Sequence, residues 1–317
     1  MARLSYDSVE ALIYDPVSAN RTATRAALYS LGFRRTETVP TLEGMVEIIQ
    51  KQTPDLVLAE TQGAADELCL AIQQLRQGSA GYNPFIVIIV TAWEKSSALI
   101  TKVVNSGADD LLLRPFSTAL LGTRIEAHIE RRKGFVITTD YVGPDRRRDV
   151  GRTADAEMFD PPNSLKMKAK DKMSADLIAK KLDAELQVAR EKLTVEKLRR
   201  DSFQVCILWR LLQDQSPNTP QFAADLIKLG NLTRAIERRC ADSGQEKAQE
   251  RCGSLLSLPD SMRNGADLRA AMSPRGAAAL GLNQLICPEK SPADQLNEID
   301  ATVAIIRARN QATALAS

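Results

Sequence analysis

Four polar residues could do chemistry together: Asp15, Glu60, Thr91 and Arg114 each come directly after a short run that is largely apolar. They offer two carboxylates, a hydroxyl and a guanidinium. Phosphoryl transfer to an acidic side chain uses a carboxylate nucleophile and positive charge that offsets the developing charge on oxygen. If the runs are parallel strands of one sheet, these four groups meet at its carboxyl edge.

Alternating strands and helices must position these groups. The predicted strands cover residues 9–14, 35–39, 55–59, 85–90 and 110–113, and the predicted helices cover 19–31, 42–50, 67–77, 96–105 and 117–132. The fourth strand is apolar at every position, which is typical of a central parallel strand buried on both faces. Five strand–helix units in this order predict an α/β fold, a five-stranded doubly wound parallel sheet with helices on both faces.

The spacing of Asp15, Glu60, Thr91 and the pair Arg114-Pro115 resembles that of receiver domains of two-component response regulators. Residues 107–116 are similar to the last strand of that family and the Lys-Pro turn that follows it. The resemblance covers residues 9 to about 132. It implies a flavodoxin-like receiver fold, a bacterial signalling protein and a phosphoacceptor pocket at the carboxyl edge of the sheet.

Several positions depart from the pattern that the resemblance implies, which is an acidic pair, an acceptor Asp, a Thr or Ser, a Lys and a switch aromatic. The corresponding residues here are Asp15 with Pro16, then Glu60, Thr91, Arg114 and Leu111. One metal-facing carboxylate is missing, and the extra methylene of Glu60 displaces the acceptor in a reaction that depends on positioning. We therefore expect a degenerate phosphoacceptor pocket that holds no metal ion and no cofactor.

Glu60 has two interpretations. In the first, Glu60 pairs with Arg114 and permanently imitates the charged state of a phosphorylated receiver. In the second, Glu60 is a polar residue satisfied at a strand end, with no signalling role. The absence of an aromatic residue at Leu111 favours the second interpretation.

An arginine cluster, Arg146, Arg147 and Arg148, follows a β-prone segment and a Gly-Pro-Asp turn. Arginine forks bind phosphates and carboxylates through paired hydrogen bonds, so one hypothesis is an anion or nucleotide site, such as one for a cyclic dinucleotide. The alternative is that these arginines pair with acidic groups of the receiver-like domain or of a partner. Residues 152–173, with Pro161-Pro162 and a run of lysines, are typical of a flexible linker with solvated charges.

The remainder of the chain is predicted to be helical. Residues 174–212 contain no Pro or Gly and carry an apolar stripe that includes Leu182 and Leu186, which suggests a projecting helix or a coiled-coil homodimer. Three later helices are expected to start at Thr219-Pro220, Ser273-Pro274 and Ser291-Pro292. The predicted divisions are 1–133 for the receiver-like domain, 134–173 for the extension and linker, 174–214 for the long helix and 215–317 for a helical region.

The sequence also argues against several functions. It has no P-loop, dinucleotide-binding turn, zinc-protease motif or nucleophile elbow, and His128 is its one histidine, so we expect no enzyme activity and no histidine phosphotransfer. A net charge of +2 and an aromatic content of 4% argue against nucleic-acid binding. On that basis a DNA-binding helix-turn-helix over residues 223–239 is the less favoured alternative. Five dispersed cysteines and the lack of a membrane segment fit a cytoplasmic protein.

These observations favour a phosphorylation-independent signalling adaptor or scaffold that recognises a protein partner through its degenerate receiver. A homodimer through the long helix is a further expectation. The alternative function is a DNA-binding or nucleotide-binding regulator acting through the helical region or the cluster at 146–148.

Overall fold

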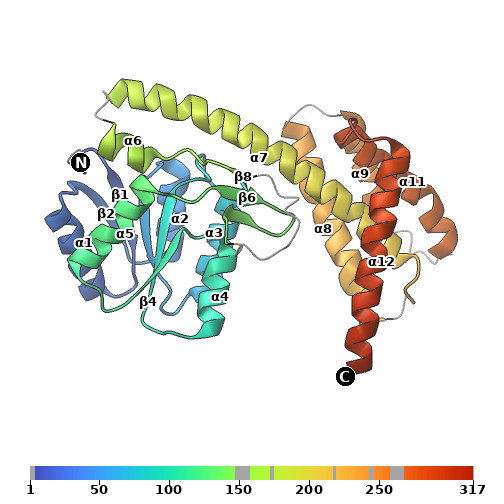
Figure 1. Ribbon diagram of the computed structural model, residues 1–317, viewed down its shortest axis with the longest axis horizontal. Helices are drawn as coiled ribbons and strands as arrows, with labels where there is room; N and C mark the ends of the chain where they lie inside the picture. The colour runs from blue at the N-terminus through green and yellow to red at the C-terminus, as the bar shows by residue number, and fades with distance from the viewer. Residues whose placement is uncertain are drawn as a thin grey trace. The chain divides into compact units, whose positions relative to one another are not determined.

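The computed structural model describes residues 4–146, 158–171, 175–216, 219–242, 246–257 and 268–316 of the chain. It divides into two compact units, residues 1–193 and residues 194–317, which are described one at a time (Figure 1). All five cysteines are buried and none forms a disulfide. Among the described residues, no helix has the length and apolar character needed to cross a membrane.

A five-stranded parallel sheet forms the centre of the first unit, in the order β2-β1-β3-β4-β5. Its strands and the helices between them are β1 (Glu10–Tyr14), α1 (Ser18–Leu31), β2 (Arg35–Val39), α2 (Leu42–Lys51), β3 (Leu56–Glu60), α3 (Ala65–Arg76), β4 (Val87–Ala92), α4 (Ser97–Ser106), β5 (Asp110–Leu113) and α5 (Thr118–Glu130). This strand order is that of the flavodoxin-like doubly wound fold. The predicted fold class is confirmed.

Local sequence signals explain where these helices begin and end. The hydroxyls of Thr41, Ser96 and Ser117 accept a hydrogen bond from a backbone N–H in the first turn of α2, α4 and α5. Gly32 and Gly107 end α1 and α4 in the left-handed conformation, with φ of 110° and 90°. Short caps of this kind fix the lengths of the connections and so place each strand end.

Each face of the sheet has its own apolar core. Helices α1 and α5 cover one face, where Leu28 and Ile125 are fully buried against residues of β1, β3 and β4. Helices α2, α3 and α4 cover the other (Figure 1). Every residue of β3 and β4 is buried, as the apolar run at 85–90 predicted for a central strand.

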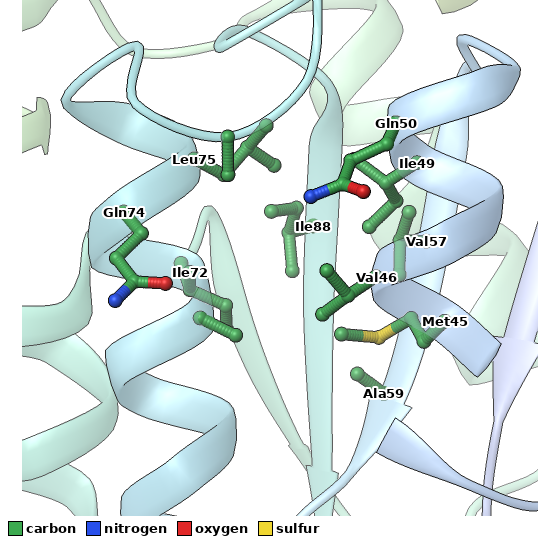
Figure 2. Close-up of a pocket in the computed structure, with 12 residues that line it drawn as sticks. Met45, Val46, Ile49, Gln50, Val57, Ala59, Ile72, Gln74, Leu75 and Ile88 are labelled. Carbon is green, nitrogen blue, oxygen red and sulfur yellow. The ribbon is translucent and has the colours of Figure 1, made fainter. Parts of the chain in front are cut away.

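A narrow gap remains between α2 and α3. In Figure 2 the side chains of Met45 and Ile49 from α2 and of Ile72 and Leu75 from α3 lie around Ile88 of the sheet. The gap has a volume of about 20 Å³, enough for roughly one water molecule. It is therefore a packing defect and not a ligand site.

The segment after α5 is folded onto the first unit. Strands β6 (Phe135–Ile137), β7 (Val142–Pro144) and β8 (Met158–Phe159) form a small antiparallel sheet, and helix α6 (Ser164–Lys170) follows. Leu165 of α6 is fully buried in the core that α1 and α5 share. The prediction of a flexible linker with solvated lysines is wrong for the described residues 158–171, because this apolar side chain anchors α6 and Lys168 bridges Glu10 and Asp55 at 2.9 and 2.8 Å.

The long helix α7 (Ala175–Leu212) begins in the first unit and has the length predicted for it. Its residues Leu186, Ala189 and Leu193 are buried against Phe85 and Phe135. Tyr82 also donates a hydrogen bond to Asp183 on this helix. Leu186 of the stripe predicted for a coiled-coil seam is therefore buried within the chain and Leu182 partly so, and the homodimer through this helix stays a prediction.

The second unit contains the end of α7 and the helices α8 (Pro220–Asp242), α9 (Glu246–Leu256), α11 (Leu268–Ile286) and α12 (Pro292–Ala316), around a core that includes Trp209. The hydroxyls of Thr219 and Ser291 cap α8 and α12 as predicted. The start predicted at residues 273–274 is wrong, since α11 begins at Leu268. The helix-turn-helix considered for 223–239 is also wrong, because α8 runs through Gly230 without a turn.

Candidate functional site

The four polar residues singled out in the sequence converge at the carboxyl edge of the sheet. Glu60 is the last residue of β3 and pairs in register with Thr91 of β4. Asp15 follows β1 directly, and Arg114 follows β5. This edge is where doubly wound sheets place their functional crevice.

Arg114 joins the two carboxylates of this site. Its Nε donates to Oε2 of Glu60 at 2.7 Å, and its Nη2 donates to Oδ2 of Asp15 at 3.1 Å. The side chain of Arg114 is only 8% exposed, and those of both acids are fully buried. One guanidinium therefore bonds carboxylates at the ends of two strands at once, which its planar fork allows and a single ammonium point charge does less well.

Both carboxylate oxygens of Glu60 have protein partners. Oε2 also accepts from the hydroxyl of Thr91 at 2.7 Å. Oε1 accepts from the hydroxyl of Thr61 at 3.3 Å and from the backbone N–H of Gln62 at 3.2 Å. These bonds compensate the cost of burying the carboxylate and fix the orientation of its oxygens.

Two residues close to Asp15 in the sequence hold its carboxylate in place. Its Oδ1 accepts from the backbone N–H of Val17 at 2.8 Å, and Asn20 lies at 3.5 Å from the same oxygen. Burial raises the pKa of the Asp15 carboxyl above its ordinary value, against the opposing effects of the Val17 N–H and of Arg114. Pro16 contributes no carboxylate, and its backbone carbonyl accepts from Arg21.

Two contacts of Arg114 were not predicted from the sequence. The hydroxyl of Thr24, on α1, accepts from Nη2 at 3.1 Å, and the ring of Phe116 lies 4.8 Å below the guanidinium carbon. An aromatic residue two positions after the arginine is the one local signal that could have indicated the second contact. Leu111, the residue at the switch position, is half-buried and packs on the core covered by α2, α3 and α4.

The resemblance to receiver domains implies a magnesium ion at this edge, and the residues present do not fit one. The place between the carboxylates of Asp15 and Glu60 is taken by the Arg114 guanidinium, which bonds both. Pro16 supplies no side-chain oxygen where the family has a second acid. Among the described residues, no cluster of three or more His, Cys, Asp or Glu side chains is arranged to hold a metal.

An open groove lies beside this ion-paired site, with a volume of about 750 Å³. Glu60, Gly63, Trp93 and Val17 are among the residues that line it. Trp93 is 52% exposed and Val17 is 38% exposed, so apolar surface is available next to a buried charge cluster.

Arg146, the first residue of the predicted arginine cluster, forms hydrogen bonds within the chain. Its Nη2 donates to the backbone carbonyls of Ala108 and Asp109 at 2.5 and 3.2 Å. Arg147 and Arg148 lie outside the described residues, so the hypothesis of an anion or nucleotide site there stays a prediction.

A second buried ion cluster was missed by sequence reasoning. The carboxylate of Asp109 accepts from Arg76 at 2.8 Å and from Arg132 at 2.8 and 3.2 Å. The ring of Phe135 lies within 5.2 Å of both guanidinium carbons. Since Arg76 also donates to the backbone carbonyls of Gly107, Pro84 and Ile86, this cluster joins the segment after α5 to the amino ends of β4 and β5.

Comparison with protein-family models finds no matching family, and comparison with curated proteins finds no relative. Solved structures with similarity include the chemotaxis protein CheY4 of Vibrio cholerae, with 18% identity and a TM-score of 0.34 over 38% of this chain and 98% of that one. The orphan response regulator HP1043 of H. pylori has 23% identity and a TM-score of 0.32 over 38% and 95%. A putative pilus assembly-related protein of Burkholderia pseudomallei has 12% identity and a TM-score of 0.33 over 37% and 87%.

Proposed function

We propose that this chain is a signalling adaptor or scaffold without enzyme activity, whose receiver-like unit recognises a protein partner independently of phosphorylation. The observation that carries the proposal is the bridge from Arg114 to both Glu60 and Asp15. A phosphoacceptor site needs a carboxylate oxygen that is free to attack and a bound metal cation. The Arg114 bridge occupies the carboxylate oxygens, and its guanidinium stands between the carboxylates in place of the metal cation.

Glu60 is a poor nucleophile in this geometry. An attacking carboxylate oxygen needs a lone pair directed at phosphorus, but Oε2 already accepts from Arg114 and Thr91, and Oε1 accepts from Thr61 and Gln62. Transfer would require breaking at least one charge-assisted hydrogen bond in a buried site. Misplacement of the nucleophile by a methylene adds to that barrier, because phosphoryl transfer depends on positioning and charge stabilisation.

The same bonds support the interpretation that Glu60 imitates a charged state. Thr91 and Arg114 both donate to one oxygen of Glu60, at 2.7 Å each. A hydroxyl and a cation are thus held by a carboxylate that is negatively charged without phosphorylation. In this proposal the unit is fixed in a single state. The exposed apolar residues Trp93 and Val17 beside the groove are the surface we assign to the partner.

The direct experiment treats the whole chain with phosphoramidate and Mg²⁺ and measures its intact mass. We expect no phosphorylated species from the parent protein. The triple variant Pro16→Asp, Glu60→Asp, Arg114→Lys puts the family's chemical groups back in the same fold, and serves as the matched positive control. A mass increase of one phosphoryl group on the parent, removed by Glu60→Ala, would refute the proposal.

Partner recognition is tested by affinity capture from the source cells with and without phosphodonor treatment. We expect the same partner in both samples, and its loss with Trp93→Ala. Leu70→Ala changes another exposed apolar side chain, on α3, and is the matched control that should retain the partner. A partner captured only after phosphodonor treatment would contradict this function.

A further inference from the structure

Helix α7 carries a second apolar stripe, on the side opposite to the residues that pack against Phe135. Leu177 is 53% exposed and Val188 is 67% exposed, and Ala184 is exposed between them. Residues on this side recur at intervals of four and three, which is the spacing of a coiled-coil seam. Within the first unit this outer seam consists of five exposed residues, Leu177, Lys181, Ala184, Val188 and Glu191.

Two opposite charges interrupt the outer seam. Neither Lys181 nor Glu191 forms an ion pair with a residue that the structure describes, and Glu191 lies 3.5 Å from the amide nitrogen of Gln187. The two charged residues are separated by about 15 Å along the helix, too far to pair with each other. A charged residue in a coiled-coil seam lowers the stability of most pairings and thereby selects one register and orientation.

The positions of these charges favour an antiparallel pairing of α7 with α7 of a second copy. In a parallel pair, Lys181 would face Lys181 and Glu191 would face Glu191, so like charges would repel. In an antiparallel pair with its two-fold axis at the level of Leu186, Lys181 of each copy faces Glu191 of the other. This holds because both residues lie five positions from Leu186, on opposite sides of it.

The apolar positions of the outer seam fit the same axis. Ala184 and Val188 each lie two positions from it, so a small side chain faces a branched one and the helices can approach closely. Leu177 lies nine positions before the axis, and α7 has Val195, 46% exposed, nine positions after it. Every facing pair over about 27 Å of helix is therefore either apolar with apolar or cation with anion.

We propose that the outer seam of α7 binds a second copy of this chain, as an antiparallel two-fold dimer in which Lys181 pairs with Glu191. A contact of this kind uses the same surface on both chains, so it closes at two copies. The seam is short and contains charges, so the association is micromolar, and the chain is a monomer in the dilute samples used for unfolding.

This dimer differs from the one first expected for the long helix. It uses the side of α7 opposite to Leu186 and does not involve the groove beside Trp93. The dimer and the phosphorylation-independent recognition of a partner can therefore fail separately.

Sedimentation velocity of the full-length chain, from low to high micromolar concentration, measures the association. We expect a reversible monomer–dimer equilibrium. Lys181→Glu places acid against acid in both facing pairs, and Glu191→Lys places cation against cation, so each should raise the dissociation constant about tenfold or more. Lys51→Glu makes the same charge change on an exposed side chain of α2 and is the matched control that should leave the constant unchanged.

Two combinations then identify the facing pair. The double variant Lys181→Glu, Glu191→Lys exchanges the two charges and should return the dissociation constant to within about threefold of the parent value. An equimolar mixture of the two single variants should also associate like the parent, because every acid then faces a cation. Both side chains are exposed, so circular dichroism of the variants should match that of the parent.

Three results would overturn the proposal. The first is a parent chain that stays monomeric at every concentration or grows beyond a dimer. The second is a dimer that neither single charge reversal weakens. The third is a pair of weakened single variants that neither the double variant nor the mixture restores.

Discussion

The guanidinium of Arg114 lies 2.7 Å from the carboxylate of Glu60, a residue 54 positions earlier in the chain, and both side chains are almost completely buried. The pair is held at the carboxyl edge of the sheet because β3 and β5 both border β4. Its hydrogen bonds to Asp15, Thr24 and Thr91 make it a network and not an isolated ion pair.

Replacing Arg114 by Met should destabilise the first unit by about 3–5 kcal/mol, because the change leaves two carboxylates buried without their cation. Arg114→Lys, which keeps the charge but not the planar fork, should lose clearly less. Urea unfolding followed by circular dichroism measures both. The double variant Arg114→Met, Glu60→Gln should recover part of the loss, with a coupling energy of about 0.5–3 kcal/mol. Strictly additive losses would mean that the bridge contributes nothing.

The backbone of the β6–β7 hairpin approaches the α4–β5 turn so closely that only glycine fits there. A Cβ on Gly107 would lie 2.4 Å from the carbonyl oxygen of Val142, and φ at Gly107 is +90°. Gly63 has a similar φ of +80° but nothing within 4 Å of the place of a Cβ. Gly63→Ala should therefore cost only the backbone strain, about 1–2 kcal/mol.

Gly107→Ala should cost that strain and a further steric penalty of about 1–3 kcal/mol, since it also forces the hairpin away. Free energies of unfolding for the two variants make the comparison, and limited proteolysis at residues 134–146 reports release of the hairpin. Equal losses in Gly107→Ala and Gly63→Ala would show that the hairpin is not packed against this turn.

The sequence predicted the doubly wound sheet and its candidate site well because both depend on local signals. Apolar runs and capping residues located each strand and helix of the sheet to within about three residues, and the polar residues at the strand ends had to converge once the strands were parallel. The contacts of Arg114 with Thr24 and Phe116 were not predictable, because they depend on which rotamers the packed site allows.

The segment after α5 was misjudged for a related reason. Lys168 belongs to a run of lysines that is typical of a solvated linker, yet it pairs with Asp55, more than a hundred residues away. Arg132, Asp109 and Arg76 likewise come from separate elements. Interactions at such separations leave no periodic pattern in the sequence. The lysines within 158–171 were therefore predicted to be exposed, and their ion pairs could be found only from the folded structure.

Helix α7 offers a matched test of the packing in the first unit. Leu186 is 2% exposed and contacts the core around Phe135, whereas Val188 is 67% exposed on the same helix. Leu186→Ala should lower the free energy of unfolding by about 2–5 kcal/mol, the usual cost of truncating a buried leucine. Val188→Ala should stay within about 0.5 kcal/mol of the parent. If size-exclusion chromatography with light scattering showed a dimer in the parent that Leu186→Ala converts to a folded monomer, the intramolecular packing described for this stripe would be wrong.

Acid should reduce the contribution of the Asp109 cluster to the free energy of unfolding. Burial tends to raise the pKa of Asp109, but the guanidiniums of Arg132 and Arg76 outweigh it and hold that pKa below its ordinary value. A carboxylate whose pKa is lower in the folded than in the unfolded state stabilises the fold above its ordinary pKa, about 3.9, and loses that contribution as the pH falls through the folded value. Asp109→Asn removes this contribution at every pH.

At pH 7 the Asp109→Asn variant should be less stable than the parent by about 3–5 kcal/mol, because two buried guanidiniums lose their counter-ion. Below about pH 4 the difference should begin to shrink, by at most about 1.4 kcal/mol per pH unit, because protonation then removes from the parent what the variant already lacks. Urea unfolding at pH 7, 5, 4 and 3 gives the two curves, and Asp140→Asn, at an exposed position of the same unit, is the control. A constant difference between parent and Asp109→Asn across this range would show that the charge of Asp109 does not stabilise the fold, and that the carboxylate acts there only through its hydrogen-bond geometry.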